Sequence, residues 1–335
     1  MGNKETKRKK VSKNDKPEKK KKALKLDKNG KEKKTPTWRK VLITVLVIII
    51  TVLLAGYFYL YGKVGKINKI ETKQERPEAL SDSFKDEDVR NILLIGQDRR
   101  PGEDRSRSDS MIICSINKKT DKITLVSVMR DTYVSIPDHG KEKINAAYVY
   151  GGMPLLDRTI EENFGIHIDG NVEVDFNGFV KAMAEVGDLD IELNQEEADY
   201  LNSGTGWGLH AGMNTLNPEQ LLSYSRIRYV GNSDWERTER QRRVIMTAFN
   251  KVKGSGLSSL LDLYEHVCPY LTTDLTNNEM ISYIYTMSSH KMTMNDRAQI
   301  PVEGSYSEQV IDGADVLVPN LEENRAYLEK TLYGE

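Results

Sequence analysis

Three short apolar runs, separated by polar joints, define the pattern between residues 91 and 131. The runs are Ile92–Ile95, Met111–Ile116 and Ile123–Val128. They are rich in β-branched residues and are bounded by Gly, Pro, Asp and Lys, a pattern that predicts three strands. If successive strands alternate in direction, the charged joints at 98–109 and 130–131 lie at one edge of the sheet. The polar turn at 117–122 then lies at the opposite edge.

The later chain alternates between helical and extended patterns. Helical spacing or a capping signal predicts helices at 153–164 before Gly165, 176–186, 218–225 after Asn217, 236–253, after the Thr276-x-x-Glu279 capping box, and from Asn320 to Leu332. Short extended segments are predicted at 131–137, 167–174, 189–193 and 315–318. The glycine-rich stretch 203–212 contains neither GxxxxGK nor GxGxxG, so it predicts a hairpin or a surface loop.

Residues 41–61, VLITVLVIIITVLLAGYFYLY, form an apolar run without a charge. As a helix that rises about 1.5 Å per residue, the run reaches about 30 Å, which is enough to cross the hydrocarbon layer. Lys and Arg crowd its N-terminal side, and the positive-inside rule then puts the preceding segment in the cytoplasm and the following one outside. A cleaved signal peptide is disfavoured because the run is too long and has no clear small-x-small cleavage site.

The first 40 residues carry 18 Lys and Arg against 5 Asp and Glu, whereas the rest of the chain carries 31 against 45. This tail has almost no apolar residues and predicts disorder. A Lys-rich block also binds nucleic acid non-specifically. The positive-inside rule and attraction to anionic membrane lipid, however, explain the basic charge of the tail without a nucleic-acid partner. No basic stripe with interleaved aromatic residues appears, so no nucleic-acid partner is predicted.

These patterns divide the chain into a disordered basic cytoplasmic tail at 1–40, a transmembrane helix at 41–61, a juxtamembrane spacer at 62–88 and an extracellular domain at 89–335. The last segment, of about 250 residues, fits a single α/β-type domain. Cys114 lies in an apolar strand and Cys268 near the end of an apolar helical stretch. Two such cysteines predict buried thiols rather than a disulfide framework, and one bridge between them stays open.

Charged side chains gather at the sheet edge predicted above. Asp98 and Arg100 follow the first strand, Arg107 and Asp109 precede the second, and Arg130 closes the third. Two carboxylates beside several arginines fit a cation bound together with a phosphorylated ligand. A solvated, salt-bridged rim fits the same residues, and this stretch alone does not separate the two.

A second cluster lies in residues 224–243, YSRIRYVGNSDWERTERQRR, and its candidate ligands are Arg226, Arg228, Asp234, Arg237, Arg240 and Gln241. Arg226 and Arg228 are two residues apart, so an extended backbone points both to one side. Arg237 and Gln241 are one helical turn apart. Guanidiniums that point to one place repel each other unless an anion lies among them, and Arg pairs two phosphate oxygens at once. In an acidic domain this favours a phosphate site over a basic surface helix paired with its own glutamates.

Other kinds of catalytic site find little support in the sequence. The five histidines show no metal-ligand spacing, and there is no GxSxG elbow. Paired carboxylates for glycoside hydrolysis are compatible with the spacing, but the density of arginine favours phosphate at the reacting centre.

The motifs NILLIGQDRR, RSDSM, SVMRDTYVSIP, KINAAYVYGG, DFNGFVKAMAEVG, LNPEQLLSYSRIR and DWERTERQ follow one another between residues 91 and 241. In this combination and order the chain resembles the LytR-CpsA-Psr family of cell-wall glycopolymer ligases, with a weaker match at VLVPN. The resemblance implies a mixed central sheet flanked by helices, with an apolar groove for a polyprenyl chain. It also implies transfer of a teichoic acid or capsule-type polymer from a polyprenyl-pyrophosphate carrier to peptidoglycan, in a Gram-positive-type envelope.

The resemblance carries over residue by residue. Asp98 and Asp109 match the family's two acidic metal positions, for Mg²⁺ or Mn²⁺. The residues that match or adjoin its pyrophosphate-binding positions are Arg100, Arg107, Arg130, Arg226, Arg228, Arg237, Arg240 and Gln241. The chain departs mildly from the family at Met129, where a proline is common, at Gly187-Asp188, where Gly-Gly is usual, and at Glu236, where a glycine often stands.

The chemistry of the substrate suggests a mechanism. Mg²⁺ and the arginines, Arg130 among them, would stabilise charge that grows on the bridging oxygen when a hydroxyl attacks the sugar-bearing phosphorus. Asp234 is the candidate general base and Asp98 its competitor. Three other functions stay open: a polyprenyl-pyrophosphate hydrolase, a membrane-bound transcriptional regulator, and a non-catalytic lipid or glycan receptor.

Overall fold

The computed structural model describes residues 48–51, 54–56, 58, 61–62, 68–69, 84–97, 107–231, 233–290 and 292–334. The chain divides into two units, 1–56 and 57–335, and the second contains the predicted extracellular domain. Within the described residues, none of the helices has the length and apolar character that crossing a bilayer requires. The predicted tail at 1–40 lies outside those residues, as do much of the predicted span at 41–61 and most of the spacer.

The domain is built on a mixed sheet whose described strands follow the order β1-β10-β7-β2-β3-β4-β11. In that order the strands are Asn68–Lys69, Thr272–Thr273, Gly170–Asp175, Val89–Gln97, Ser108–Asn117, Lys122–Val128 and Thr293–Ile300. The three strands predicted from the apolar runs are β2, β3 and β4, and they are antiparallel neighbours as expected. β7 runs parallel to β2, and β11 runs parallel to β4, so the expectation of a mixed sheet is confirmed.

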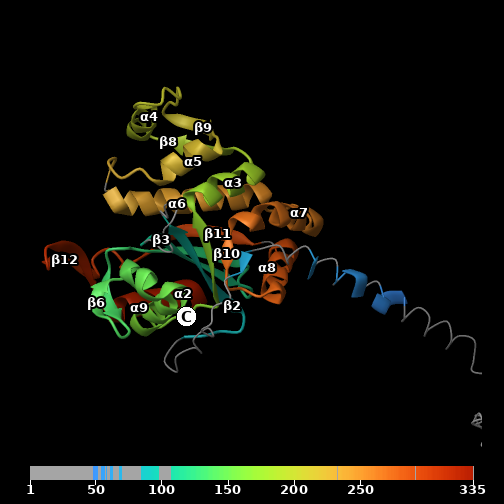
Figure 1. The fold of residues 1–335 in the computed structure, drawn as a ribbon, viewed down its shortest axis with the longest axis horizontal. Helices are drawn as coiled ribbons and strands as arrows, with labels where there is room; N and C mark the ends of the chain where they lie inside the picture. The colour runs from blue at the N-terminus through green and yellow to red at the C-terminus, as the bar shows by residue number, and fades with distance from the viewer. Residues whose placement is uncertain are drawn as a thin grey trace, which may run out of the picture. The chain divides into compact units, whose positions relative to one another are not determined.

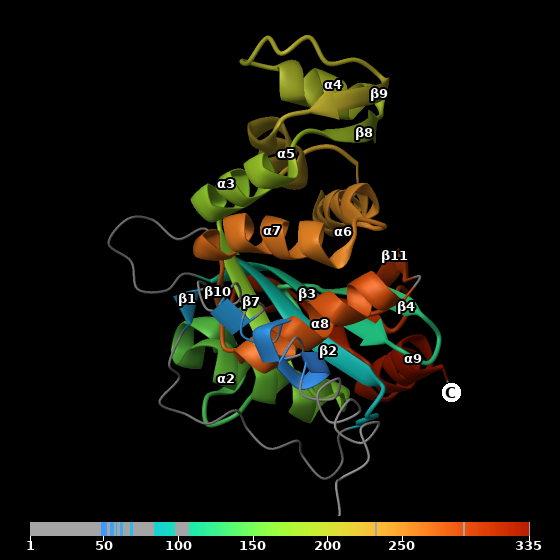
Figure 2. The same cartoon turned by 90° about the vertical axis from the view of Figure 1, so that its right-hand side faces the viewer.

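Side chains alternate across this sheet and form two apolar cores. On one face, Leu93, Ile113 and Val126 pack against α2 (Asn145–Phe164) and α9 (Leu321–Tyr333). On the other face, Ile92 and Ile123 pack against Phe249 of α6 (Ser233–Val252) and Tyr283 of α8 (Asn277–Ser289). This period of two is what a strand with both faces covered requires. Figures 1 and 2 show α2 on one side of the sheet and α6 with α7 (Leu257–Val267) on the other.

A smaller lobe stands over α6, with an apolar core of its own that includes Leu189, Leu201 and Tyr224. Its elements are α3 (Phe176–Val186), β8 (Leu189–Leu193), α4 (Gln195–Asn202), β9 (Gly212–Leu216) and α5 (Pro218–Ser225). β8 and β9 pair antiparallel, with α4 between them in the chain. Figure 1 shows α4 and this strand pair at the end of the lobe that lies farthest from the main sheet.

Two hairpins complete the fold: β5 (Tyr133–Ile136) with β6 (Gly140–Lys143), and β12 (Tyr306–Ile311) with β13 (Ala314–Pro319). The second hairpin is joined to the end of β4, because the backbone N–H of Leu317 donates to the carbonyl of Asp131 at 2.9 Å. A short 3₁₀ turn at Cys268–Tyr270 follows α7. The bond to Asp131 fixes the root of the β12–β13 hairpin next to the end of β4.

Several local predictions are confirmed by the backbone. Asn217 and Thr276 form the capping boxes of α5 and α8, and Gly165 ends α2 in the left-handed conformation. The sequence patterns did not predict α4 and β9, which flank the glycine-rich loop at 203–212, nor the strands β6, β10, β11 and β12. No disulfide bond joins Cys114 and Cys268, which settles the open question of a bridge between them. Burial raises the pKa of Cys114 to about 12, so this thiol is not a nucleophile at neutral pH.

Candidate active site

Asp109 in β3 and Arg130 after β4 meet at one sheet edge, as the strand directions predicted, whereas the charged residues 98–100 after β2 lie outside the described residues. Arg130, just after β4, donates from Nη1 to Oδ1 of Asp109 in β3 at 3.0 Å. Its Nε and Nη2 lie 3.1 and 3.0 Å from Oδ2 of Asp234 in α6, and its Nε lies 3.4 Å from Asp131. Burial lowers the pKa of Arg130, but the carboxylates of Asp234, Asp109 and Asp131 together raise it by more than burial lowers it. The pKa of Arg130 is therefore above the ordinary value for arginine.

Helix α6 brings a second guanidinium to the same carboxylates. Arg237 is almost fully buried; its Nε lies 3.2 Å from Asp234, and its Nη1 donates to the carbonyl oxygen of Asp109 at 3.1 Å. Arg228 lies 3.4 Å from the other Asp109 oxygen. Burial lowers the pKa of Arg237, and the nearby Asp234 offsets this only in part. Arg130, Arg228 and Arg237 are matched here by Asp109, Asp131 and Asp234, and their forked guanidiniums suit the oxygens of a phosphate ligand.

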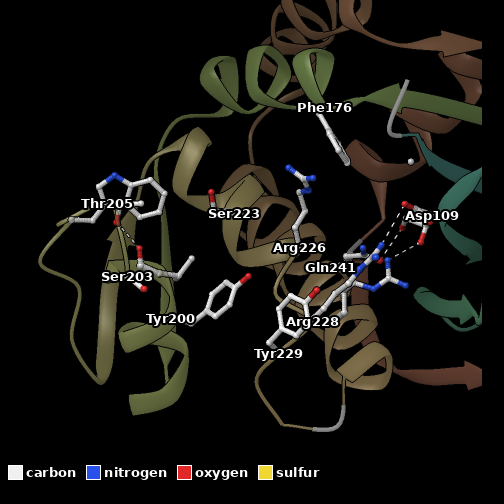
Figure 3. A pocket seen from close by; sticks show the side chains of 15 residues that line it. Asp109, Phe176, Tyr200, Ser203, Thr205, Ser223, Arg226, Arg228, Tyr229 and Gln241 are labelled. Carbon is white, nitrogen blue, oxygen red and sulfur yellow. Dashed lines mark hydrogen bonds and ion pairs between the residues drawn. The ribbon is translucent and has the colours of Figure 1, made fainter. Parts of the chain in front are cut away.

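A polar cavity of about 650 Å³ opens onto this cluster. Asp109, Arg226, Arg228, Arg237 and Gln241 line one part of it. The other part is lined by Tyr200, Leu201, Ser203, Thr205, Trp207, Ser223 and Tyr229. Figure 3 shows Tyr200 and Tyr229 on the side away from Asp109, with Arg226 between. One end of the cavity is therefore cationic, and the other end offers aromatic faces and hydroxyl groups.

A second cavity, of about 230 Å³, adjoins the first and is mostly apolar. Its apolar wall comes from the sheet and from α3, α5 and α6: Leu94, Ile112, Val172, Val174, Phe179, Leu222, Val244 and Ile245. The two cavities share Gly96, Ser110, Phe176, Arg226 and Gln241. At this junction a Cβ on Gly96 would lie 3.0 Å from the Cβ of Ser110 on the paired strand, so a larger residue at position 96 would require Ser110 to shift.

The sequence model of the LytR_cpsA_psr family matches residues 54–331. The chain belongs to this family. It is 30% identical, over 81% of its length and 86% of the relative's, to the polyisoprenyl-teichoic acid–peptidoglycan teichoic acid transferase TagU of Oceanobacillus iheyensis. It is 33% identical to the regulatory protein MsrR of Staphylococcus aureus, over 56% of each chain. Among solved structures it resembles TagT bound to LIIa-WTA, with a TM-score of 0.63 and 25% identity over 78% of this chain and 98% of that one.

In this LytR-CpsA-Psr domain the predicted site residues fall into three groups. Those brought together at the cluster or along the polar cavity are Asp109, Arg130, Arg226, Arg228, Asp234, Arg237 and Gln241. Asp98 and Arg100 lie outside the described residues. Arg107 and Arg240 are described, but neither lines the polar cavity. The geometry therefore gathers most of the predicted set, although ligand binding by these residues stays a prediction.

Two predicted ligands have other contacts. Arg107 is exposed and lies 3.7 Å from Glu142. Arg240 is 1% exposed, and it pairs with Glu197 of α4 and Glu236 of α6 at 2.7 Å each. We therefore correct the interpretation of Arg240 as a pyrophosphate ligand: its guanidinium holds the small lobe to α6 instead, because its charge is already matched inside the protein.

The backbone at Arg226 also differs from the expectation. The prediction that an extended segment points Arg226 and Arg228 to one side is wrong, because Arg226 ends α5 with a helical-type conformation at φ −106° and ψ −1°. Both side chains nevertheless reach the polar cavity, since the chain turns there. The guanidinium of Arg226 packs over the ring of Phe176 at 4.1 Å, a contact that no local sequence pattern predicts.

Only one of the two predicted metal ligands, Asp109, is among the described residues. Within those residues no group of three His, Cys, Asp or Glu side chains could hold a metal ion. Asp109 supplies carboxylate oxygens, the kind of donor that Mg²⁺ prefers, at the wall of the polar cavity. Both carboxylate oxygens of Asp109 face arginines, Arg130 and Arg228. A cation could therefore bind this carboxylate only together with an anion that pairs with those arginines. Metal binding at Asp109 therefore stays a prediction.

The contact between Phe176 and Arg226 leads to a prediction on substrate affinity. Phe176→Leu removes the aromatic face that orients Arg226, and a partly exposed cation–π contact is worth about 0.5–1 kcal/mol. We expect the KM for a pyrophosphate-linked donor to rise about threefold with kcat unchanged. Phe176→Tyr keeps the ring and is the control. A normal donor KM in Phe176→Leu would contradict the assigned role of Arg226.

Proposed function

We propose that this protein is a phosphotransferase that moves a glycopolymer, of the teichoic acid or capsule type, from a polyprenyl-pyrophosphate carrier to peptidoglycan and forms a phosphodiester. One observation carries the proposal: Arg226 and Gln241 lie where an apolar cavity joins a polar one, and Arg228 and Arg237 line the polar cavity beside them. A polyprenyl-pyrophosphate glycan has a matching order of parts: an apolar prenyl chain, a charged pyrophosphate and a polar sugar. The relative named as a teichoic acid transferase supports the choice of substrate.

Each part of the donor has a matching part of the site. The prenyl chain enters the apolar cavity, where burial of hydrocarbon stabilises binding. The pyrophosphate lies at the junction, within reach of Arg226, Arg228, Arg237 and Gln241, with Arg130 behind Asp109. The first sugar then extends toward Tyr200 and the hydroxyl groups of the polar cavity. Arg forks suit this ligand because they pair two phosphate oxygens at once.

The reaction is a displacement at phosphorus. A hydroxyl of peptidoglycan attacks the sugar-bearing phosphorus, the bond to the bridging oxygen breaks, and polyprenyl phosphate leaves. Arg130 and Arg237 stabilise the charge that develops during this step. The proton of the attacking hydroxyl goes to Asp234, whose carboxylate lies between these two arginines. Asp98, outside the described residues, is the other candidate for this proton.

A divalent cation, Mg²⁺ or Mn²⁺, is part of the proposal. Asp109 and Asp98 would hold it, and when bound it offsets the charge of the pyrophosphate. We expect EDTA to abolish transfer and added Mg²⁺ to restore it. Calorimetric titration should detect Mg²⁺ binding in the presence of a pyrophosphate donor, and Asp109→Asn should weaken that binding at least tenfold, roughly the effect of losing a charged ligand. Full activity in EDTA with no Mg²⁺ binding would exclude the metal.

The apolar cavity gives a prediction on the lipid. Val172 lines it from β7, and Val172→Phe would fill part of its volume. Overfilling an apolar site costs about 1–3 kcal/mol, so we expect the KM for a long-chain donor to rise about tenfold or more. A donor with a short prenyl chain should be affected less, and Val172→Ile is the conservative control. Equal effects on both donors would place the lipid elsewhere.

The membrane topology remains part of the proposal. Residues 41–61 would anchor the chain once, with the basic tail 1–40 in the cytoplasm and the domain after residue 62 outside. This arrangement suits a catalyst whose donor lipid and acceptor are both at the outer surface of the membrane. The charge asymmetry of the sequence supports it.

A transfer assay with the full-length protein in detergent tests the function. The assay contains Mg²⁺, a short lipid-linked glycan and a peptidoglycan oligosaccharide, and products are identified by mass spectrometry. A glycan–peptidoglycan adduct supports the ligase. Free glycan phosphate without an adduct, for every acceptor tried, would indicate a hydrolase, and retention of intact lipid would indicate a receptor.

A regulatory function is the second candidate, because one relative is named a regulatory protein. In the proposed topology only the basic tail could reach DNA. Deletion of residues 4–34 should therefore leave DNA retention of the full-length protein unchanged if the chain is a transferase. A loss of specific DNA binding on that deletion would favour the regulator.

A further inference from the structure

Two aromatic rings stack beside the reacting cluster and outside both cavities. The rings of Trp235 and Tyr306 are 5.3 Å apart, with 30° between their planes. Trp235 follows Asp234 directly at the start of α6, and Tyr306 is the first residue of β12. Both side chains are half-buried, and neither lines the polar or the apolar cavity. Figure 1 shows β12 on the same side of the domain as one end of α6.

Tyr306 is held in place by the root of its hairpin. The backbone N–H of Asn320 donates to the carbonyl of Ser305 at 2.7 Å, and the side chain of Asn324 donates to the hydroxyl of Ser305 at 2.8 Å. The partner strand β13 is bonded to Asp131, which contacts Arg130. The aromatic pair is therefore fixed relative to Arg130 and Asp234 at both of its ends.

A third cavity, of about 650 Å³, lies farther along α6, and neither of the two rings lines it. It is mostly polar, and its lining residues are Glu239, Arg242, Arg243, Met246, Gln299, Val302, Glu303 and Tyr327. Glu239 lies one helical turn after Trp235 on the same face of α6, and Glu303 lies three residues before Tyr306. We call Trp235, Tyr306 and this cavity the α6 groove; Trp235 directly follows Asp234 in the chain, and the cavity shares no lining residue with the two donor cavities.

This inference about the α6 groove rests on the proposed function. The two substituents of the pyrophosphate, lipid and sugar, account for the apolar and polar cavities. The acceptor hydroxyl must then approach by a third route that ends at the proposed base. We propose that the α6 groove binds the acceptor glycan of peptidoglycan, with one sugar on the Trp235–Tyr306 pair and the charged peptide stem in the cavity beyond.

The chemistry of the groove fits this occupant. Aromatic faces pack against the apolar face of a sugar ring, and polar groups around them fix its orientation. The cavity carries both signs of charge, with Glu239 and Glu303 opposite in sign to Arg243. A peptide stem carries both ammonium and carboxylate groups. Burial raises the pKa of Tyr306, with Glu308 and Glu303 adding to the effect, so its hydroxyl stays protonated as a donor.

Steady-state kinetics of the full-length protein test the proposal, with a lipid-linked glycan as donor and a peptidoglycan oligosaccharide with stem peptides as acceptor. We expect Tyr306→Ala to raise the acceptor KM by about fivefold to tenfold, the value of an aromatic contact, with the donor KM unchanged. Tyr306→Phe keeps the ring and should restore most of the acceptor affinity. Glu303→Gln, at an exposed position that folding does not depend on, should raise the acceptor KM only for acceptors with a free amine.

Tyr285→Ala, on the exposed surface of α8, is the matched control and should change neither KM. If the wild-type protein transfers glycan but Tyr306→Ala and Glu303→Gln both keep a normal acceptor KM, the α6 groove is not the acceptor site. An equal rise in donor and acceptor KM for Tyr306→Ala also overturns it, because the effect would then be on the cluster. Absence of transfer by the wild-type protein would overturn the proposed function first, and the groove with it.

Discussion

Arg130→Ala should abolish glycan transfer while leaving the domain folded. Arg130 bridges Asp109, Asp234 and Asp131, so its removal leaves three carboxylates beside the site where two phosphates must bind. The loss of one pre-positioned donor of this kind costs about 100-fold to 1,000-fold in rate. We expect more here, because the variant also removes one positive charge from the side of the cavity where the phosphates bind. The assay is kcat for adduct formation, and thermal unfolding checks the fold.

Two comparisons make the Arg130 result specific. Arg158→Ala removes an arginine of α2 whose contacts are Glu162 in the same helix and Asp138 in the β5–β6 turn, and it should leave kcat unchanged. Arg130→Lys keeps the charge but loses the fork, so it should retain only a small part of the activity. Normal transfer by a folded Arg130→Ala protein would show that the sheet-edge cluster is a salt-bridged rim and not the reacting centre.

Arg240→Met should strongly lower the free energy of unfolding of the domain, and we expect it to change substrate binding only slightly. Its guanidinium is buried between Glu197 and Glu236 and also donates to the carbonyl of Ile227 at 3.2 Å. Removal of one partner from a buried ion pair costs about 3–5 kcal/mol, because the remaining carboxylate stays buried without its countercharge. Chemical denaturation followed by circular dichroism measures this loss of unfolding free energy.

The matched control for Arg240 is Arg158→Met, which breaks an exposed pair and should cost no more than about 1 kcal/mol. Below the unfolding transition, Arg240→Met should keep the donor KM near the wild-type value. A stable Arg240→Met protein with a raised donor KM would contradict the structural role and would return Arg240 to the pyrophosphate-binding set.

The sheet could be predicted because its signal is local. Three apolar runs with β-branched residues identified β2, β3 and β4, and their alternating directions placed Asp109 and Arg130 at one edge. The N-cap residue Asn217, followed by Pro218, and the capping box at Thr276 located the starts of α5 and α8. Helix α4 was missed although Asn194 and Glu197 form the same kind of capping box, because the helix is short, mostly polar and followed by a glycine-rich loop.

The error at Arg240 results from that missed helix. Spacing along α6 correctly put Arg237 and Gln241 on one face and Arg240 beside them, but spacing does not tell which neighbour is buried. The decisive partner, Glu197, lies in α4 and is 43 residues away in the chain. For the same reason the sequence did not reveal Tyr200 and Trp207, which line the cavity from α4 and the loop after it. Local sequence patterns cannot predict contacts that are made through an element they did not predict.

The number of phosphates in the adduct tests the proposed phosphoryl transfer most directly. The full-length protein is given a lipid-linked glycan with a ³²P label on the sugar-bearing phosphorus, together with a peptidoglycan oligosaccharide. Displacement at phosphorus predicts an adduct that keeps this one labelled phosphate, with polyprenyl phosphate released in equal amount. An adduct without phosphate, accompanied by polyprenyl pyrophosphate, would show attack at the sugar carbon and would contradict phosphoryl transfer at the arginine cluster.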